Sequence, residues 1–378
     1  MNLIYISNTR IPSEKANSYQ SIIMASVFTN YFSKVELWVG DVRNTKDMRK
    51  VKDIFDFYGI ENNFPIKKIK QFDCKYIAYI NEFLWSQIRN TFFAFNVCFR
   101  LMKFRKKPNY VFYTRTFHFA LLFYFLRKIK IFKNLIIYEV HNHSYLNSYI
   151  ASKVDAIIVI NNYLKNVFVK KNNNIHVAHD GVELNSFSKI GNVNLSKKSY
   201  NVLYSGSFYE WKGVKTLIDS SKFLPNCFKI KCVGGSGAAL ENIIKYCHNK
   251  GLDNRIEILP FQNRKKLLRI IENSDILVLP NSSKHIESLY TSPIKLFEYM
   301  ASKRPIVASN LDSIKEILND DNAYLFAADD PKDLSLKIIQ ATKEGFQNKV
   351  ENAYSDVQSY TWNKRAEGIF KFISRLKV

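Results

Sequence analysis

A short stretch in the second half of the chain, LYSGSFYEWKGVKTL, places a glycine and a lysine where a phosphate could bind. Its apolar start predicts a strand that ends at Gly206, and Lys212-Gly213 opens a predicted helix. Gly206 would let a ligand approach the backbone closely, because glycine has no side chain. Lys212 is a compact point charge suited to a diphosphate. The stretch therefore predicts one part of a phosphate site.

A second stretch, from Asn281 to Asn310, adds the groups that a nucleotide needs. Ser292 as the N-cap and Pro293 at the first helical position predict a helix that begins there. The free N–H groups and the dipole at a helix start attract phosphate, and Lys295 in the first turn would add charge. Glu298 lies one turn further on, and its carboxylate can accept two hydroxyl hydrogen bonds, as ribose recognition requires.

Both stretches follow predicted strands in a chain of alternating strands and helices, which is typical of parallel α/β folds. We expect two Rossmann-like doubly wound domains facing a cleft, residues 1–190 and 200–358, with a polar linker around 186–200 and a final amphipathic helix in 359–378. Ligands of such sheets bind beyond the carboxyl ends of the strands. Residues directly after strands are therefore the functional candidates. The predicted strands are 3–7, 35–39, 110–113, 135–140, 156–160, 175–178, 201–204, 229–233, 255–259, 276–279, 305–308 and 323–326.

The composition of the 378-residue chain, 47% apolar and 24% charged, is that of a globular protein. The longest central apolar run, 117–126, is far shorter than the ~20 residues that a membrane-spanning helix needs. The N-terminus shows no secretory signal pattern, so we expect a cytoplasmic location. The cysteines form no C-x-x-C pair and no zinc-ligand spacing with histidine, which predicts free thiols and no metal site. They are Cys74, Cys98, Cys227, Cys232 and Cys247.

With these residues in hand, the chain resembles the retaining glycosyltransferases of family four, which have the GT-B fold. Gly206 and Lys212-Gly213 match the family's G-x5-K-G, and Glu298 matches the second Glu of its Glu-x7-Glu motif. The family's N-G-V-D turn is similar to HDGVE at 179–183. A helix with a Trp near its start, TWNKRAEGIF, also fits, and in the family this helix crosses back to the N-terminal domain.

The chain departs from the family pattern at three places. The first Glu of the Glu-x7-Glu motif falls on Tyr290, where Glu287, three residues upstream, is a candidate substitute. The family's arginine after the strand glycine falls on Ser207, which leaves Lys212 as the diphosphate cation. The Gly-Gly loop after the first strand is replaced by residues 13–18. Some members of the family look like this, so the departures indicate a variant site.

The resemblance implies transfer of a sugar with retention of configuration, from a nucleotide-diphosphate sugar to a glycan or lipid-linked acceptor in cell-surface polysaccharide synthesis. It implies no cofactor and no catalytic metal, and it implies that the leaving phosphate itself takes the acceptor proton. Two alternatives stay open: a catalytically silent sugar-nucleotide-binding partner and a GT-B sugar-nucleotide epimerase. The implied catalytic residues are His141, Lys212 and Glu298; the donor site comprises Gly206, Ser207, Lys212, Pro260, Phe261, Glu287, Tyr290, Thr291, Ser292, Ile294, Lys295 and Glu298; the acceptor site comprises Lys15, Asn17, Ser18 and Arg115.

The charge balance points to an anionic partner. The chain has 56 Lys and Arg against 33 Asp and Glu, a net charge of +23, although part of this excess is equally well explained as a solvated surface. Basic residues concentrate between Lys75 and Lys133, where they alternate with aromatic residues, a pattern typical of an interfacial helix on anionic lipid. The alternatives are a core-facing helix with a solvated basic rim and, less favoured, a nucleic-acid surface. We expect a peripheral protein on the inner face of the plasma membrane, with no nucleic-acid partner.

Overall fold

The computed structural model describes residues 1–72 and 81–376, which form two compact units. Unit 1 contains residues 1–178 and 362–378, and unit 2 contains residues 179–361. Cys74 and Lys75, named above, lie outside the described residues. In the described ranges no helix is both long and apolar enough to cross a bilayer.

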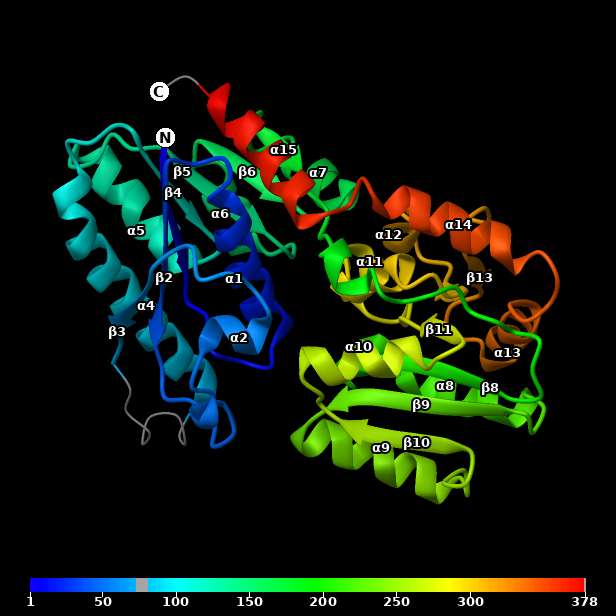
Figure 1. The fold of residues 1–378 in the computed structure, drawn as a ribbon. Coiled ribbons are helices and arrows are strands. Elements are labelled where there is room, and N and C mark those ends of the chain that lie inside the picture. Colours follow the sequence, from blue (N-terminus) through cyan, green and yellow to red (C-terminus); the bar gives the residue numbers. More distant parts are fainter. Residues whose placement is uncertain (73–80, 377–378) are drawn as a thin grey trace. The chain divides into compact units, whose positions relative to one another are not determined.

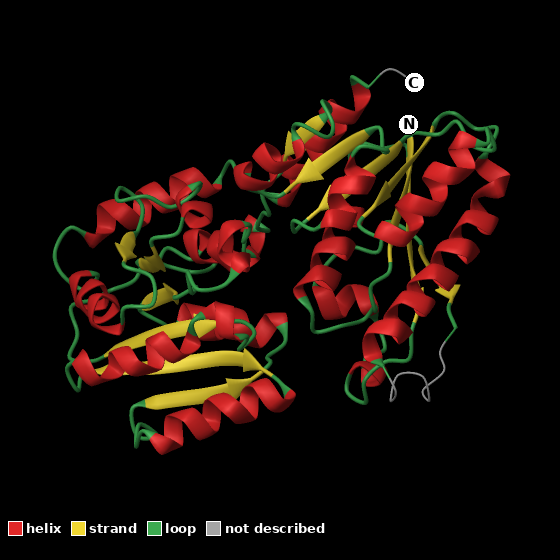
Figure 2. Cartoon of the chain, turned by 180° about the vertical axis from the view of Figure 1, so that it is seen from behind, coloured by secondary structure: helices red, strands yellow, loops and turns green. Residues whose placement is uncertain are grey.

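Unit 1 is built on a parallel sheet with helices on both faces (Figure 2). Its described strands are ordered β3-β2-β1-β4-β5-β6-β7. The strands are β1 Asn2–Ser7, β2 Lys34–Asp41, β3 Ile66–Lys70, β4 Tyr110–Thr114, β5 Ile136–Val140, β6 Ala156–Val159 and β7 Ile175–Val177. The helices are α1 Ala16–Phe28, α2 Ile54–Tyr58, α4 Glu82–Leu101, α5 Phe117–Lys128, α6 Tyr145–Ala151, α7 Asn162–Phe168 and α15 Trp362–Ser374.

Unit 2 repeats the same plan with the order β10-β9-β8-β11-β12-β13. The strands are β8 Tyr200–Ser205, β9 Phe228–Gly235, β10 Ile256–Pro260, β11 Ile276–Leu279, β12 Ile306–Ser309 and β13 Tyr324–Phe326. The helices are α8 Val214–Ser220, α9 Gly237–Asn249, α10 Arg264–Glu272, α11 Ile294–Ala301, α12 Asp312–Lys315, α13 Pro331–Gln340 and α14 Phe346–Val357. The strands of both described sheets pair in parallel, and the predicted doubly wound fold is confirmed.

The sequences of the strands explain why they occupy the interior. Parallel strands covered by helices on both faces read as continuous apolar runs, because every side chain is buried. In β11, ILVL, all four residues are buried, and β6, AIIV, is the same. Burial of such side chains stabilises the fold by roughly 1.5–3 kcal/mol each. The apolar runs therefore determine which residues form the buried strands, and the polar residues that follow each strand lie at the carboxyl edge of the sheet.

The last helix, α15, packs on α1 of unit 1, and the two helices lie side by side in Figure 1 (red and dark blue). Trp362, which is almost fully buried, makes an edge-on contact with the ring of Tyr19. Unit 2 begins at residue 179, which is earlier than the sequence predicts. Residues 179–190, expected in the first domain, lie in unit 2 because Val182 pairs with Thr361 and because Phe187 and Ile190 belong to its core.

Candidate functional site

The strand order of unit 2 reverses between β8 and β11, and ligands of open α/β sheets bind at such a reversal. The loops after these two strands carry Lys212 and Lys295. Lys212 lies in a short 3₁₀ helix, Glu210–Lys212, and its Nζ is 3.6 Å from the centroid of the Trp211 ring. Lys295 lies in the first turn of α11, with its Nζ 4.1 Å from the centroid of the Tyr204 ring. Both ammonium groups rest on aromatic faces, which attract cations.

Gly206 makes this arrangement possible. Its φ of +139° lies in the region that side chains disfavour, and a Cβ at this position would be 1.9 Å from the Nζ of Lys295. The close approach predicted for Gly206 is therefore made by Lys295. Gly213, with φ of +67°, has the same role at the other end of the loop, since a Cβ there would be 1.7 Å from the carbonyl oxygen of Pro280. The two glycines hold the loop after β8 against the end of β11.

The electrostatics of the two lysines favour an anionic ligand. Burial, together with the charge of Lys295, holds the pKa of Lys212 well below its usual range. Burial lowers the pKa of Lys295 to about 7, although the charge of Glu298 opposes this shift. The Nζ of Lys295 is enclosed and has no hydrogen-bond partner among the described residues. A bound diphosphate would supply the missing acceptor and stabilise the charged form of both lysines.

Glu298, the predicted ribose acceptor, is nearly buried on α11 and forms an ion pair with Arg264 at the start of α10. The guanidinium of Arg264 also lies over the ring of Phe187, 5.8 Å from its centroid. In this structure the carboxylate is therefore held by an arginine, and a ribose would have to share Glu298 with Arg264 or displace it.

The start of α11 differs from the sequence prediction by one residue and in its cap. The helix begins at Ile294, Pro293 occupies the N-cap position, and no side chain caps the helix. The hydroxyl of Ser292 instead accepts a hydrogen bond from the backbone N–H of Asp180 at 3.5 Å. Ser292 as the N-cap was thus wrong, because its hydroxyl is engaged by the turn at 179–183. Thr291, directly before it, is buried.

The other predicted donor residues lie at the same carboxyl edge of the sheet. Ser207 follows Gly206, and its carbonyl accepts a hydrogen bond of 2.6 Å from Tyr204. Pro260 ends β10, and Phe261 is exposed, with its N–H bound to the carbonyl of Gly235 at 3.1 Å. Glu287 and Tyr290 lie half-buried in the segment before α11, where the Tyr290 N–H donates to the Glu287 carbonyl.

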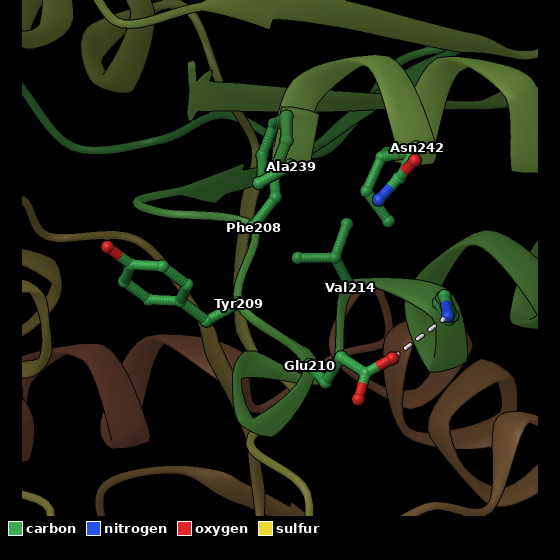
Figure 3. A pocket seen from close by; sticks show the side chains of 8 residues that line it. Phe208, Tyr209, Glu210, Val214, Ala239 and Asn242 are labelled. Atoms are coloured by element: carbon green, nitrogen blue, oxygen red, sulfur yellow. Dashed lines mark ion pairs between the residues drawn. The ribbon is translucent and has the colours of Figure 1, made fainter. Parts of the chain in front are cut away.

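A separate pocket of about 290 Å³ lies beside the 207–215 segment, between α8 and α9 (Figure 3). Its walls include Phe208, Val214 and Ile243, and an ion pair of 3.5 Å between Glu210 and Lys215 lies at one side. None of the predicted donor residues lines this pocket. The pocket is lined by residues on either side of Lys212 in the sequence, but Lys212 itself does not line it.

In unit 1, two predicted residues are linked through buried groups. His141 follows β5, and its Nε2 is 2.7 Å from a carboxylate oxygen of Glu139. Arg115 follows β4 and donates to Gln20 of α1 at 2.5 Å. Gln20 in turn donates to Glu139 at 3.3 Å. His141 and Arg115 are therefore brought to one cluster.

The predicted acceptor loop lies at the start of α1. Lys15 and Asn17 are exposed, and Lys15 occupies the N-cap position of the helix. Ser18 is buried, and its hydroxyl bonds with the hydroxyl of Thr9 and the carbonyl of Arg10. Of the three predicted acceptor residues in this loop, Lys15 and Asn17 are therefore the exposed ones.

Among residues 1–72 and 81–376, no group of three His, Cys, Asp or Glu side chains is arranged to hold a metal ion. The adjacent carboxylates Asp329 and Asp330 are engaged in hydrogen bonds. Asp330 caps α13, and Asp329 accepts hydrogen bonds from the N–H and hydroxyl of Ser283.

Sequence reasoning missed Arg264, Glu139, Gln20 and Arg365. Arg264 stands in a run of basic residues, NRKK, and nothing in that run distinguishes the one that turns inward. Glu139 did carry a signal, because it is a lone carboxylate inside the apolar strand LIIYEV. A charge at such a position is almost always paired.

The fold and the lysine pair define a class, that of doubly wound proteins with two buried lysines at the strand reversal of one unit. Comparison with known proteins makes the class specific. Residues 187–356 match the family model described as glycosyl transferases group 1. Over its whole length the chain aligns with the crystal structure of Anabaena HepE in complex with UDP and glucose, with a TM-score of 0.72 and 14% identity over 100% of both chains. Sucrose-phosphate synthase from Thermosynechococcus elongatus aligns with a TM-score of 0.71 and 14% identity over 100% and 99% of the chains.

Residues 187–356 thus belong to the glycosyl transferases group 1 family, and the chain has the GT-B fold. In sequence, the chain is similar to an uncharacterized glycosyltransferase of Methanocaldococcus jannaschii, with 25% identity over 61% of this chain. It is also similar to a mycobacterial D-inositol 3-phosphate glycosyltransferase, with 23% identity over 39% of this chain. The matches span 63% and 34% of the lengths of these two relatives.

We expect Lys212→Ala to weaken binding of a nucleoside diphosphate, with UDP as the probe, by about 10–150-fold and to leave binding of the nucleoside, uridine, unchanged. A charge-assisted contact contributes roughly 1.5–3 kcal/mol, and only the diphosphate uses it. Isothermal titration calorimetry measures both affinities. Lys215→Ala is the matched control, because Lys215 lies three residues on and pairs with Glu210. Equal losses for UDP and uridine would contradict the assignment of Lys212 to the diphosphate.

We also expect the affinity for UDP to fall as the pH rises above about 7. The pKa of Lys295 is about 7 in the free protein, and a bound diphosphate raises it, so binding takes up a proton in this range. The affinity should fall by up to about tenfold for each pH unit until the pKa of the bound state is reached. Titrations between about pH 7 and pH 8.5 measure the slope. Lys295→Arg should make the slope shallower, because arginine stays charged; a flat profile for the parent protein contradicts this prediction.

Proposed function

We propose that this protein is a retaining, metal-independent glycosyltransferase of the hexosyl type that moves a sugar from a nucleotide-diphosphate donor to a glycan or lipid-linked acceptor. The observation that carries the proposal is the pair of desolvated lysines at the strand reversal of unit 2. It is supported by the family match of 187–356 and by the names of similar structures, since HepE was crystallised with UDP-glucose and TarM with UDP and α-GlcNAc-glycerol. We place its role in cell-surface polysaccharide synthesis.

The chemistry follows from where negative charge develops. When the bond between the sugar and the diphosphate breaks, charge accumulates on the leaving phosphate. Lys212 and Lys295 lie where they can offset that charge, and the uncapped start of α11 adds its dipole. Two lysines and a helix dipole supply the positive charge that a divalent cation would otherwise bring. In unit 1, His141 and Arg115 are the residues proposed to contact the sugar or the acceptor.

A silent binding partner is the second candidate function, favoured by Tyr290 and Ser207 at positions where the family has charged residues. Both candidates use the same lysine pair, so binding alone does not separate them. Turnover does. The epimerase alternative needs no acceptor, because such an enzyme would interconvert nucleotide sugars directly.

We expect transfer from one nucleotide-diphosphate sugar of a panel, with a product whose anomeric configuration equals that of the donor. Chelation with EDTA should leave the rate unchanged. Mass spectrometry detects the transfer and ¹H NMR of the anomeric proton gives the configuration. A product of inverted configuration, or activity lost on chelation and restored by a divalent metal, overturns the mechanism. Binding without any turnover or donor hydrolysis identifies the silent partner.

We expect Glu298→Gln to reduce discrimination between UDP and its 2′,3′-dideoxy analogue. A carboxylate that accepts two hydroxyls loses charge assistance as an amide, which costs roughly 1–2 kcal/mol, or about 5–30-fold, for UDP alone. Competition titrations give the ratio of affinities. Glu272→Gln, an exposed carboxylate on the adjacent helix α10, is the control. If Glu298→Gln unfolds, Glu298→Asp keeps the charge opposite Arg264; an unchanged ratio in a folded variant excludes ribose recognition by Glu298.

The basic aromatic stretch supports a peripheral membrane location. On one side of α4, Trp85, Phe93 and Val97 are buried, as a core-facing helix requires. Other aromatic residues of the helix are exposed: Phe83 at its first turn is 73% exposed and Phe99 near its end is 79% exposed. Phe92 and Phe95 are exposed as well, and the exposed cations Arg105, Lys106 and Lys107 follow the helix. Exposed aromatic rings next to cations fit an anionic lipid surface, where each Lys or Arg contributes about 1 kcal/mol.

We expect the protein to sediment with vesicles that contain phosphatidylserine and to remain free of neutral vesicles. Salt should release it, because surface charges are screened beyond about 8–10 Å. Replacing Arg105, Lys106 and Lys107 with Gln should weaken sedimentation without slowing transfer to a soluble acceptor. Replacing the exposed lysines Lys198, Lys222 and Lys229 of unit 2 removes the same charge and is the control. If the two triple variants weaken sedimentation equally, Arg105, Lys106 and Lys107 contribute only general surface charge and form no specific membrane site.

A further inference from the structure

Glu139 is a fully buried carboxylate in the middle of unit 1, and four side chains donate to it. One oxygen accepts from the Nη2 of Arg365 on α15 at 2.8 Å and from the Nε2 of His141 at 2.7 Å. The same oxygen accepts from Gln20 of α1 at 3.3 Å, and the second oxygen accepts from the hydroxyl of Tyr113 on β4 at 2.5 Å. No single helix or strand therefore accounts for the carboxylate.

The charge of Glu139 is fixed by these contacts. Burial alone would raise its pKa, but Arg365, His141 and Arg115 together hold the pKa of Glu139 well below its usual range. An ionised carboxylate can only accept hydrogen bonds. The proton between His141 and Glu139 therefore belongs to the Nε2 of His141.

His141 itself is neutral at physiological pH. Burial and the charge of Arg115 lower the pKa of His141 to about 4, although Glu139 opposes the shift and Arg365 adds to it. A neutral imidazole with its proton on Nε2 has a lone pair on Nδ1. The side chain of His141 is 25% exposed, whereas that of Glu139 has no exposure. The ring thus has one nitrogen engaged with the interior and one left to accept a hydrogen bond.

Arg115 is connected to the same carboxylate. Its guanidinium donates to the side-chain oxygen of Gln20, and the amide nitrogen of Gln20 donates to Glu139. The orientation of the Gln20 amide is set by this chain, because only its nitrogen can donate to a carboxylate. Glu139 therefore orients His141 directly and Arg115 through one intermediate.

We propose that Glu139 is a positioning residue for sugar transfer, which fixes His141 in the Nε2–H form so that Nδ1 accepts a hydrogen bond from a substrate hydroxyl. The contact between His141 and a sugar hydroxyl rests on the proposed function, whereas the tautomer of His141 does not depend on it. Arg365 is needed so that the carboxylate can be buried with its charge. A purely structural ion pair between β5 and α15 is the competing explanation, and it makes no demand on the tautomer of His141.

The direct test is ¹⁵N NMR of histidine-labelled full-length protein, with the His141 signals assigned by their absence in His141→Gln. We expect a protonated Nε2 and an unprotonated Nδ1 in the parent protein from neutral pH down to about pH 5. In Glu139→Gln, a glutamine N–H can donate to Nε2, so an Nδ1–H population should appear. Glu36→Gln is the matched control, because Glu36 is a buried carboxylate on β2 of the same sheet that pairs with Lys67 and Lys34.

The second readout is transfer rate, which should fall by about tenfold in Glu139→Gln, equal to roughly one hydrogen bond, and less than twofold in Glu36→Gln. Should Glu139→Gln fail to fold, Glu139→Gln combined with Arg365→Met leaves no unpaired buried charge and carries the same expectations. An unchanged tautomer in a folded Glu139 variant, or an equal change in Glu36→Gln, overturns the proposal. If the parent transfers no sugar, the proposed function fails while the NMR result still decides the role of Glu139.

Discussion

The reversal of strand order in each parallel sheet is the constraint on which the rest of the molecule depends. In both units the chain winds outward from one central strand and then restarts on its other side, next to β1 in unit 1 and next to β8 in unit 2. Helices that cross over to opposite faces leave the loops after the two central strands diverging at the carboxyl edge. Arg115 follows one such strand, and the lysine loops follow the other pair. The strand order therefore determines where the candidate functional residues lie, and individual side-chain contacts only refine these positions.

The two units use buried charge in opposite ways. In unit 1, the charge of Glu139 is compensated by Arg365, and both carboxylate oxygens accept hydrogen bonds. In unit 2, Lys212 and Lys295 are both buried. Their pKa values are lowered because burial, and for Lys212 also the charge of Lys295, disfavours the charged form. A fully satisfied network stabilises one arrangement, whereas an unsatisfied one has free energy to gain from a ligand. The first is suited to holding side chains in place and the second to binding an anion.

The alternation of elements and most strand positions could be predicted from the sequence, because buried parallel strands such as ILVL and AIIV are unambiguous apolar runs. The positions of Gly206, Lys212 and Lys295 in the segments that follow strands were also predictable, since their spacing relative to the strands carries the signal. Partners across the fold could not be predicted. Arg264 meets Glu298 and Arg365 meets Glu139 across 34 and 226 residues, and no local pattern encodes such pairs. The N-cap assigned to Ser292 failed for the same reason, because a distant backbone N–H engages its hydroxyl.

The path of the chain between the units has a consequence for synthesis. Unit 2 is one continuous segment, 179–361, inserted into unit 1, which resumes with α15. On the ribosome, unit 2 is complete before the helix that covers α1 and neutralises Glu139 has been made. Until residue 365 emerges, unit 1 carries a buried carboxylate without its arginine and an uncovered apolar surface on α1. Nascent unit 1 therefore lacks part of its packing and the charge partner of Glu139 while the later half of the chain is translated.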